Sequence, residues 1–154
     1  MMESRNNWKL ISVLIGVAFI MFCGCKEDTL PQANPQPVIQ LMGVSSKTIK
    51  QFKDSLVITI SFTDGDGDIG ENNPDKNDIW VKDSRLTKPD FYFLKPLTPP
   101  GSTLQVKGSI AIQLKNTFLL GTADTETTNY EVKIRDRAGN WSNTITTPAI
   151  TITK

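Results

Sequence analysis

Six carboxylates fall within the fifteen residues from 64 to 78, the densest group of potential cation ligands in the chain. Asp64, Asp66 and Asp68 alternate with glycines, which let a backbone curl so that successive carboxylates turn inward. Carboxylate, amide and backbone carbonyl oxygens are the usual ligands of Ca²⁺, which takes about six to eight of them. The spacing therefore predicts a Ca²⁺ site, and its main expected ligands are Asp64, Asp66, Asp68 and Asp75.

This loop differs from the EF-hand, a calcium loop that lies between two helices. Its first three aspartates match the first, third and fifth positions of the Asp-x-Asp-x-Asp-Gly pattern. Ile69 stands where that pattern has its glycine, Gly70 follows one residue later, and Asp75 replaces the glutamate at the twelfth position. No helical periodicity flanks the segment, so we interpret it as a calcium loop at the end of a strand.

The acidic loop also has an interpretation that needs no cation. Only Lys76 opposes the six acids, so the loop repels itself unless its charge is neutralised or solvated. A solvated turn, in which backbone N–H groups donate to the carboxylates, fits the same residues. Further candidate ligands are Glu71 and Asp78 of the loop and, if the final hairpin packs beside it, Asp136 and Asn140.

The elements that must position this loop are strands, because apolar and polar residues alternate with a period of two. The clearest segments are 56–63, 110–114, 130–135 and 150–152, and weaker ones are 38–44, 79–82, 91–97 and 103–107. Gly, Pro, Asn and Asp interrupt the pattern about every ten residues. We therefore predict an all-β domain over residues 38–154, an antiparallel β-sandwich of about seven strands.

The last strand pair carries a resemblance. Residues 130–142 follow the pattern Tyr-x-Val-x-Ile-x-Asp-x-Ala-Gly-Asn-x-Ser, in which Gly139 and Asn140 supply a tight turn. This string resembles the final hairpin of bacterial immunoglobulin-like and fibronectin-III-like domains. The resemblance implies an Ig-like sandwich, with Tyr130 near the start of a late strand in the position of a tyrosine corner.

The N-terminal segment carries a second resemblance. A basic stretch precedes the apolar run Leu10–Phe22, which is too short to span a bilayer of about 30 Å but fits the central region of a signal peptide. Gly24 and Cys25 follow, and this pair resembles the lipobox of bacterial lipoproteins. The resemblance implies cleavage before Cys25 and its lipidation, with enough acyl chains for stable anchoring. An ordinary secretory signal, or an uncleaved anchor, is the alternative.

The segment after Cys25 bears on location. Residues 1–24 are the predicted signal peptide, and residues 25–37 are the predicted lipidated cysteine and a flexible tether that contains three prolines. Lys26, Glu27 and Asp28 resemble the export signal that sends lipoproteins of the Bacteroidota to the outer face of the outer membrane. We expect a lipid-anchored outer-membrane protein that faces the cell exterior, and a position facing the periplasm is the alternative.

Composition narrows the classes of function. Removal of residues 1–24 leaves 130 residues with 15 basic and 15 acidic side chains and no basic cluster, which argues against nucleic acid as a partner. The chain has no histidine, the commonest general base. With Cys25 lipidated and Cys23 removed, no disulfide is expected. These features predict a protein that is not an enzyme.

The string Phe-Thr-Asp-Gly-Asp-Gly-Asp-Ile-Gly is similar to that of uncharacterised Bacteroidota lipoproteins with one β-sandwich, which implies a fold and a location but no activity. We expect a non-catalytic binding or structural module whose partner is an unidentified protein or polysaccharide. Phe91, Tyr92 and Phe93 are candidates for its contact surface. One alternative is an accessory subunit of an outer-membrane transport or assembly complex. Another is a glycan hydrolase that uses paired carboxylates.

Overall fold

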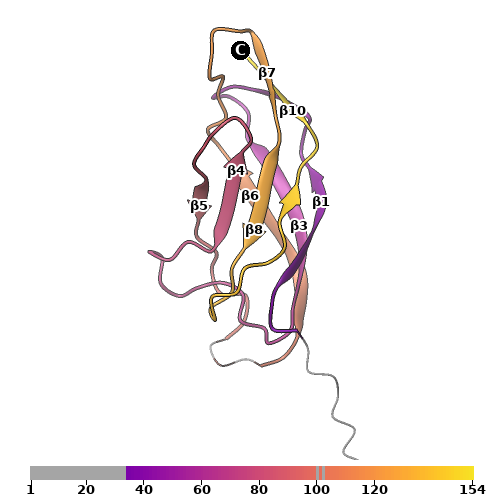
Figure 1. Ribbon diagram of the computed structural model, residues 1–154, viewed down its shortest axis with the longest axis vertical. Helices are drawn as coiled ribbons and strands as arrows, with labels where there is room; N and C mark the ends of the chain where they lie inside the picture. Colours follow the sequence, from indigo (N-terminus) through magenta and orange to yellow (C-terminus); the bar gives the residue numbers. More distant parts are fainter. Residues whose placement is uncertain (1–33, 100, 102) are drawn as a thin grey trace, which may run out of the picture. The chain divides into compact units, whose positions relative to one another are not determined.

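The computed structural model describes residues 34–99, 101 and 103–154, which form ten strands and no helix (Figure 1). The predicted all-β sandwich is therefore confirmed. The predictions for the signal peptide, Cys25, the segment from Lys26 to Asp28 and most of the tether lie outside the described residues. Among the residues that are described, no helix has the length and apolar character needed to cross a membrane.

The strands are as follows, in chain order. They are β1 (Val38–Val44), β2 (Thr48–Lys50), β3 (Leu56–Asp64), β4 (Ile79–Asp83), β5 (Asp90–Tyr92), β6 (Val106–Leu114), β7 (Thr125–Thr128), β8 (Tyr130–Ile134), β9 (Ile145–Thr146) and β10 (Ile150–Thr153). The number of strands exceeds the predicted seven because the count includes four short strands of two to four residues, β2, β5, β7 and β9.

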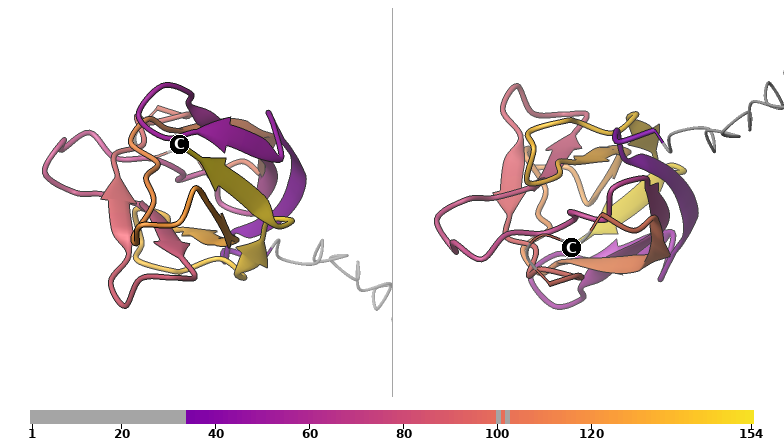
Figure 2. Two further views of the ribbon diagram at one scale, coloured as in Figure 1. Left: turned by 90° about the horizontal axis from the view of Figure 1, so that it is seen from above. Right: turned by 90° about the horizontal axis from the view of Figure 1, so that it is seen from below.

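The strands form three sheets. Antiparallel pairing joins β1, β3 and β6 in one layer, and it joins β5, β4, β8 and β9 in the other. In the third sheet, β10 lies between β2, to which it is parallel, and β7, to which it is antiparallel. Seen end-on, β1 lies on the side opposite β4 and β5 (Figure 2). The Ig-like connectivity that the hairpin implies stays a prediction.

The register of β3 places one face of the strand in the core. Burial alternates strictly along β3, so that Leu56, Ile58, Ile60 and Phe62 all point inward. Leu56 pairs with Leu114 of β6, and the pairing continues without a shift to Asp64 opposite Val106. Because side chains alternate with a period of two, the face that buries Phe62 must also bury Asp64.

The ends of the strands bring two distant loops together. Ile79 of β4 pairs with Ile134 of β8, so the loop before β4 and the turn after β8 leave the sheet at the same end. Val38 of β1 pairs with Thr63 of β3 at this end as well (the lower end in Figure 1). Ile69 forms a bridge with Asp136, which connects the acidic loop directly to the final turn.

Candidate metal centre

Asp64 is the starting point of the site because it is a carboxylate on a core-facing position. It is the last residue of β3, and its side chain is fully buried. A buried charge is unfavourable unless it is paired, hydrogen-bonded or bound to a metal. The burial follows directly from the alternation in β3, since Asp64 occupies the next inward position after Phe62.

Glycines and a buried isoleucine determine how the chain continues after Asp64. Gly67 has a positive φ of 71°, and the backbone N–H of Asp68 turns back to donate to Asp64 Oδ2 at 2.8 Å. Ile69 is fully buried and anchors the loop in the core. Gly70 has φ of 84°, and a Cβ there would lie 2.2 Å from the carbonyl oxygen of Lys95. Only glycine therefore fits this position.

Three carboxylates converge at this end of the sandwich. Asp64, Asp68 and Asp136 each offer one oxygen, and these oxygens all lie within 4.8 Å of one another. Asp64 and Asp136 are buried, and Asp68 is partly buried. This buried cluster of three aspartates could hold a metal ion.

Several oxygens around the cluster have nothing to satisfy them. Buried Oδ1 atoms of Asp64, Asp66 and Asp68 have no hydrogen-bond partner among the described residues. A buried carboxylate oxygen without a partner is strongly unfavourable, and native proteins rarely contain one without a reason. A cation held by the converging carboxylates would give Asp64 and Asp68 the partner that these oxygens lack, so the residues present fit a metal ion.

The electrostatic environment disfavours negative charge at Asp64 and at Asp68. Burial, together with the neighbouring charges of Asp66, Asp68 and Asp136, raises the pKa of Asp64 to about 6 against the opposing effect of the Asp68 N–H. The pKa of Asp68 is raised by burial first, then by Asp136 and Asp66, against the opposing effects of the Ala138 N–H and Arg137. These carboxylates therefore favour either a proton or a cation.

The final hairpin supplies both a carboxylate and the groups that orient it. Asn140 donates from its backbone N–H to Asp136 Oδ1 at 2.7 Å and from its side-chain nitrogen to Asp136 Oδ2 at 2.9 Å. The backbone N–H of Ala138 donates to Asp68 Oδ2 at 2.9 Å. Asp136, expected as an additional ligand, is thus part of the cluster, whereas Asn140 holds Asp136 in place.

The remaining acids of the loop lie elsewhere. Asp75 is exposed, and its backbone N–H donates to Asn73 Oδ1 at 3.0 Å. Glu71 forms an ion pair with Lys76 at 3.5 Å. Asp78 is buried, and its Oδ1 accepts from Arg135 Nη2 at 3.1 Å. The structure therefore places Asp75, Glu71 and Asp78 outside the three-carboxylate cluster.

Asp66 lies beside the cluster. It is partly buried, one of its oxygens is buried and unpartnered, and its charge raises the pKa values of both Asp64 and Asp68. Its carboxylate is not among those whose oxygens lie within 4.8 Å of one another. The side-chain conformation of Asp66 would have to change before Asp66 could bind the same cation as these three carboxylates.

Sequence reasoning missed a second charged group at the other end of the sandwich. Arg85 donates to both oxygens of Asp83, at 3.0 and 2.7 Å, and to Glu126 Oε2 at 2.5 Å. The Thr128 hydroxyl donates to Asp83 Oδ1 at 2.5 Å. Asp83 points into the core as the last residue of β4, a signal comparable to that of Asp64, and Arg85 is only two residues away. The contacts with Thr128 and Glu126 are distant in sequence and cannot be predicted from spacing.

Oxygen ligands without histidine or cysteine suit a hard divalent cation such as Ca²⁺, Mg²⁺ or Mn²⁺ rather than Zn²⁺ or Cu²⁺. Comparison of the chain with protein-family models, with curated proteins and with solved structures finds no match in any of the three. We therefore infer the function from the geometry of the described residues.

Proposed function

We propose that this chain is a lipid-anchored, non-catalytic binding or structural module of the bacterial outer membrane that Ca²⁺ stabilises. The observation that carries the metal proposal is the convergence of Asp64, Asp68 and Asp136, with oxygens within 4.8 Å of one another and buried atoms that lack partners. Asp66, beside them, is the proposed fourth carboxylate.

Ca²⁺ is favoured over Mg²⁺ by the kind of loop that surrounds the cluster. Ca²⁺ accepts an irregular shell of about six to eight oxygens, whereas Mg²⁺ needs a nearly ideal octahedron at about 2.0–2.1 Å and gives up its waters reluctantly. Glycines at 65 and 67 also let the backbone of the loop adapt to a larger ion. The three clustered carboxylates, with Asp66 beside them, also exceed the one or two that Mg²⁺ sites commonly contain.

The proposed ion would connect the two layers of the sandwich. Asp64 ends β3 in the layer of β1, β3 and β6, whereas Asp136 follows β8 in the layer of β5, β4, β8 and β9. A cation held between them ties the layers at one end, as a disulfide does in many exported sandwiches. At free Ca²⁺ a hundredfold above Kd, the gain in folding free energy is about 2.7 kcal/mol.

The location in this proposal is supported by the sequence alone. Cys25 after a signal-peptide-like segment supports the lipid anchor, and the residues Lys26, Glu27 and Asp28 support export to the outer face. The partner would be a protein or a polysaccharide that the exposed loops contact. A position facing the periplasm, an accessory role in a transport or assembly complex, and glycan hydrolysis are the alternatives.

The test is thermal unfolding of the full chain, freed of metal and then titrated with CaCl₂ or MgCl₂. We expect Ca²⁺ to raise Tm by several degrees and Mg²⁺ to raise it much less. Asp136→Asn should abolish the increase, because the cluster loses one of its three carboxylates. Asp75→Asn is the matched control, since this carboxylate is exposed and lies outside the cluster. An unchanged wild-type Tm, or equal effects of the two substitutions, would contradict the metal proposal.

A further inference from the structure

A cavity of about 540 Å³ opens at the end of the sandwich opposite the carboxylate cluster. It lies between the ends of β4 and β5 and the segment that follows β6. Asp83 pairs with Tyr130 at this end of the sheet that contains β4 and β8. Ile79 pairs with Ile134 at the opposite end of the same two strands, beside the carboxylate cluster. Its volume falls within the range of about 300–1,000 Å³ that is usual for small-molecule sites.

The charged groups in the wall of this cavity largely neutralise one another. Arg85 uses three of its N–H groups on Asp83 and Glu126, so its positive charge is already matched. Asp90 and Lys115 also line the cavity and carry opposite charges. A phosphate or a carboxylate would find no free guanidinium here, and a cation would find no free pair of carboxylates. The balance favours a neutral ligand.

One lining group points to a polar ligand. Thr117 is buried, and its hydroxyl has no hydrogen-bond partner among the described residues. A buried hydroxyl without a partner is unfavourable, and a ligand in the cavity would satisfy it once the Thr117 side chain rotates its hydroxyl toward the cavity. Tyr92, Asn116 and Tyr130 also line the cavity and add two phenol groups and an amide. These groups can donate to and accept from a ligand that carries several hydroxyls.

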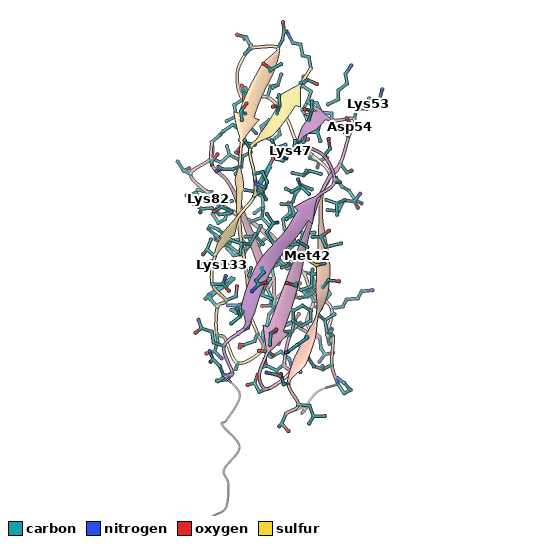
Figure 3. All side chains as sticks on the ribbon, turned by 90° about the vertical axis from the view of Figure 1, so that its right-hand side faces the viewer. Met42, Lys47, Lys53, Asp54, Lys82 and Lys133 are labelled. Atoms are coloured by element: carbon teal, nitrogen blue, oxygen red, sulfur yellow. The ribbon has the colours of Figure 1, made fainter. Side chains whose placement is uncertain are left out.

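The wall of the cavity also has an aromatic face. Phe118 lines the cavity and stacks on Phe52, with ring centroids 6.2 Å apart and an interplanar angle of 3°. Phe52 is 71 % exposed and has a positive φ of 55°, the only such value for a non-glycine residue in the described part of the chain. Its backbone N–H donates to the carbonyl of Thr117 at 3.1 Å. Lys53 and Asp54 follow it in the same turn (Figure 3).

The unusual conformation of Phe52 needs an explanation. A bulky residue in the left-handed region is strained by about 1–3 kcal/mol, and such strain persists where the surroundings hold it. Here the turn is held by the Asp54 carboxylate, which accepts from the backbone N–H of Lys50 at 2.8 Å, and by the bond from Phe52 to Thr117. In this turn the Phe52 ring is exposed and stacks on Phe118.

We propose that this cavity binds a neutral sugar residue, either free or at the end of a glycan. A pyranose ring combines apolar C–H faces, which pack on aromatic rings such as Phe118 and Tyr92, with hydroxyls that bond to amide, hydroxyl and carboxylate groups. The cavity presents both kinds of group on walls without excess charge. The site is separate from the proposed calcium site, so it does not depend on metal binding.

The test is titration of the ¹⁵N-labelled full chain in detergent, followed by backbone amide shifts. The free-sugar probes are glucose, galactose, mannose and N-acetylglucosamine, and cellobiose and diacetylchitobiose represent the end of a glycan. Concentrations up to roughly 50 mM would saturate a site of millimolar affinity. At least one neutral probe should shift the amides of Tyr92 and of residues 116–118, and glucuronate and glucose 6-phosphate should bind more weakly. A disaccharide that binds more tightly than its monosaccharide identifies a glycan end.

Two substitutions separate a binding role from a structural one. Thr117→Val keeps the shape but removes the hydroxyl, so Tm should stay the same or rise while sugar affinity falls about fivefold, the effect of one lost hydrogen bond. Tyr92→Phe should weaken binding similarly. Met42→Ala, an exposed apolar residue on β1 that does not line the cavity, is the control and should leave affinity unchanged.

Three results would overturn the proposal: no shift with any neutral probe, affinities of Thr117→Val and Tyr92→Phe equal to wild type, or tighter binding of the charged probes. Asp136→Asn should bind sugar as wild type does, since its carboxylate lies at the other end of the sandwich. Sugar binding can therefore fail while calcium binding succeeds, and the reverse also holds.

Discussion

Replacement of Asp64 by asparagine should have opposite effects on stability without and with Ca²⁺. The Asp64 carboxyl is fully buried, and burial together with Asp66, Asp68 and Asp136 raises its pKa from 3.8 to about 6. A shift of this size corresponds to as much as about 3 kcal/mol of unfavourable free energy for the ionised form in the folded protein. The asparagine side chain of Asp64→Asn would keep the shape and the acceptor for the Asp68 N–H but would carry no charge.

The sign of the pH dependence follows from the direction of the shift. Because the folded pKa of Asp64 lies above the unfolded value, the stability that its protonated form contributes is fully present below 3.8 and is lost as the pH rises through about 6. Calcium-free wild-type protein should therefore lose stability over this interval. Asp64→Asn should lose less and should be the more stable of the two at about pH 7.

Added Ca²⁺ should reverse that order. The ion neutralises the carboxylates of the wild type and stabilises it by about 2.7 kcal/mol at a hundredfold excess over Kd, whereas Asp64→Asn lacks an essential ligand and gains little. Urea unfolding across the pH interval, in metal-free buffer and with CaCl₂, measures both effects, and Asp75→Asn controls for a general loss of acidic charge. A calcium-free Asp64→Asn protein that is less stable than wild type at about pH 7, or a calcium effect of equal size in both, would refute this reasoning.

Three further predictions concern other parts of the chain. Gly70→Ala should destabilise the domain by about 2–4 kcal/mol in the same urea assay, because its Cβ would clash with the Lys95 carbonyl and its φ is positive. Gly139→Ala is the comparison and should cost less, because its Cβ would meet no atom within 4 Å. Cys25→Ala should move the protein from the detergent phase to the aqueous phase in a phase-separation assay, and retention in the detergent phase would contradict lipidation. Alanine at positions 26–28 should protect the protein from protease added to whole cells, and digestion equal to wild type would contradict the export prediction.

Much of the strand pattern could be predicted from the sequence because the alternation that produces it is local. The segment 38–44 matches β1, and the segments 56–63, 130–135 and 150–152 match β3, β8 and β10 to within one residue at each end. The segment 110–114 is the second half of β6. The alternation is interrupted at Gly108, and the structure shows why. A Cβ at position 108 would lie only 2.9 Å from the Phe62 ring, which leaves no room for a side chain.

Other strands could not be predicted because their pairing depends on tertiary contacts. β7 has the sequence Thr-Glu-Thr-Thr and carries no apolar side chain, yet it pairs with β10 over its whole length. β2 and β9 are only three and two residues long. Of the predicted segment 91–97, only the first two residues belong to a strand, β5. The rest crosses the acidic loop, where Leu94 accepts from the Glu71 N–H and Leu97 donates to the Ile69 carbonyl.

Alternation in the sequence predicts a strand that ends at the acidic loop and names Asp64 as a ligand, and the same period of two explains why Asp64 lies on the buried face. Which acids share a site depends on contacts between distant segments. Asp75 is close in sequence but projects into solvent, whereas Asp136 is distant but is brought in by the bridge to Ile69 and the pairing of β4 with β8. Ligand geometry depends on contacts between strands, and spacing along one segment does not contain that information.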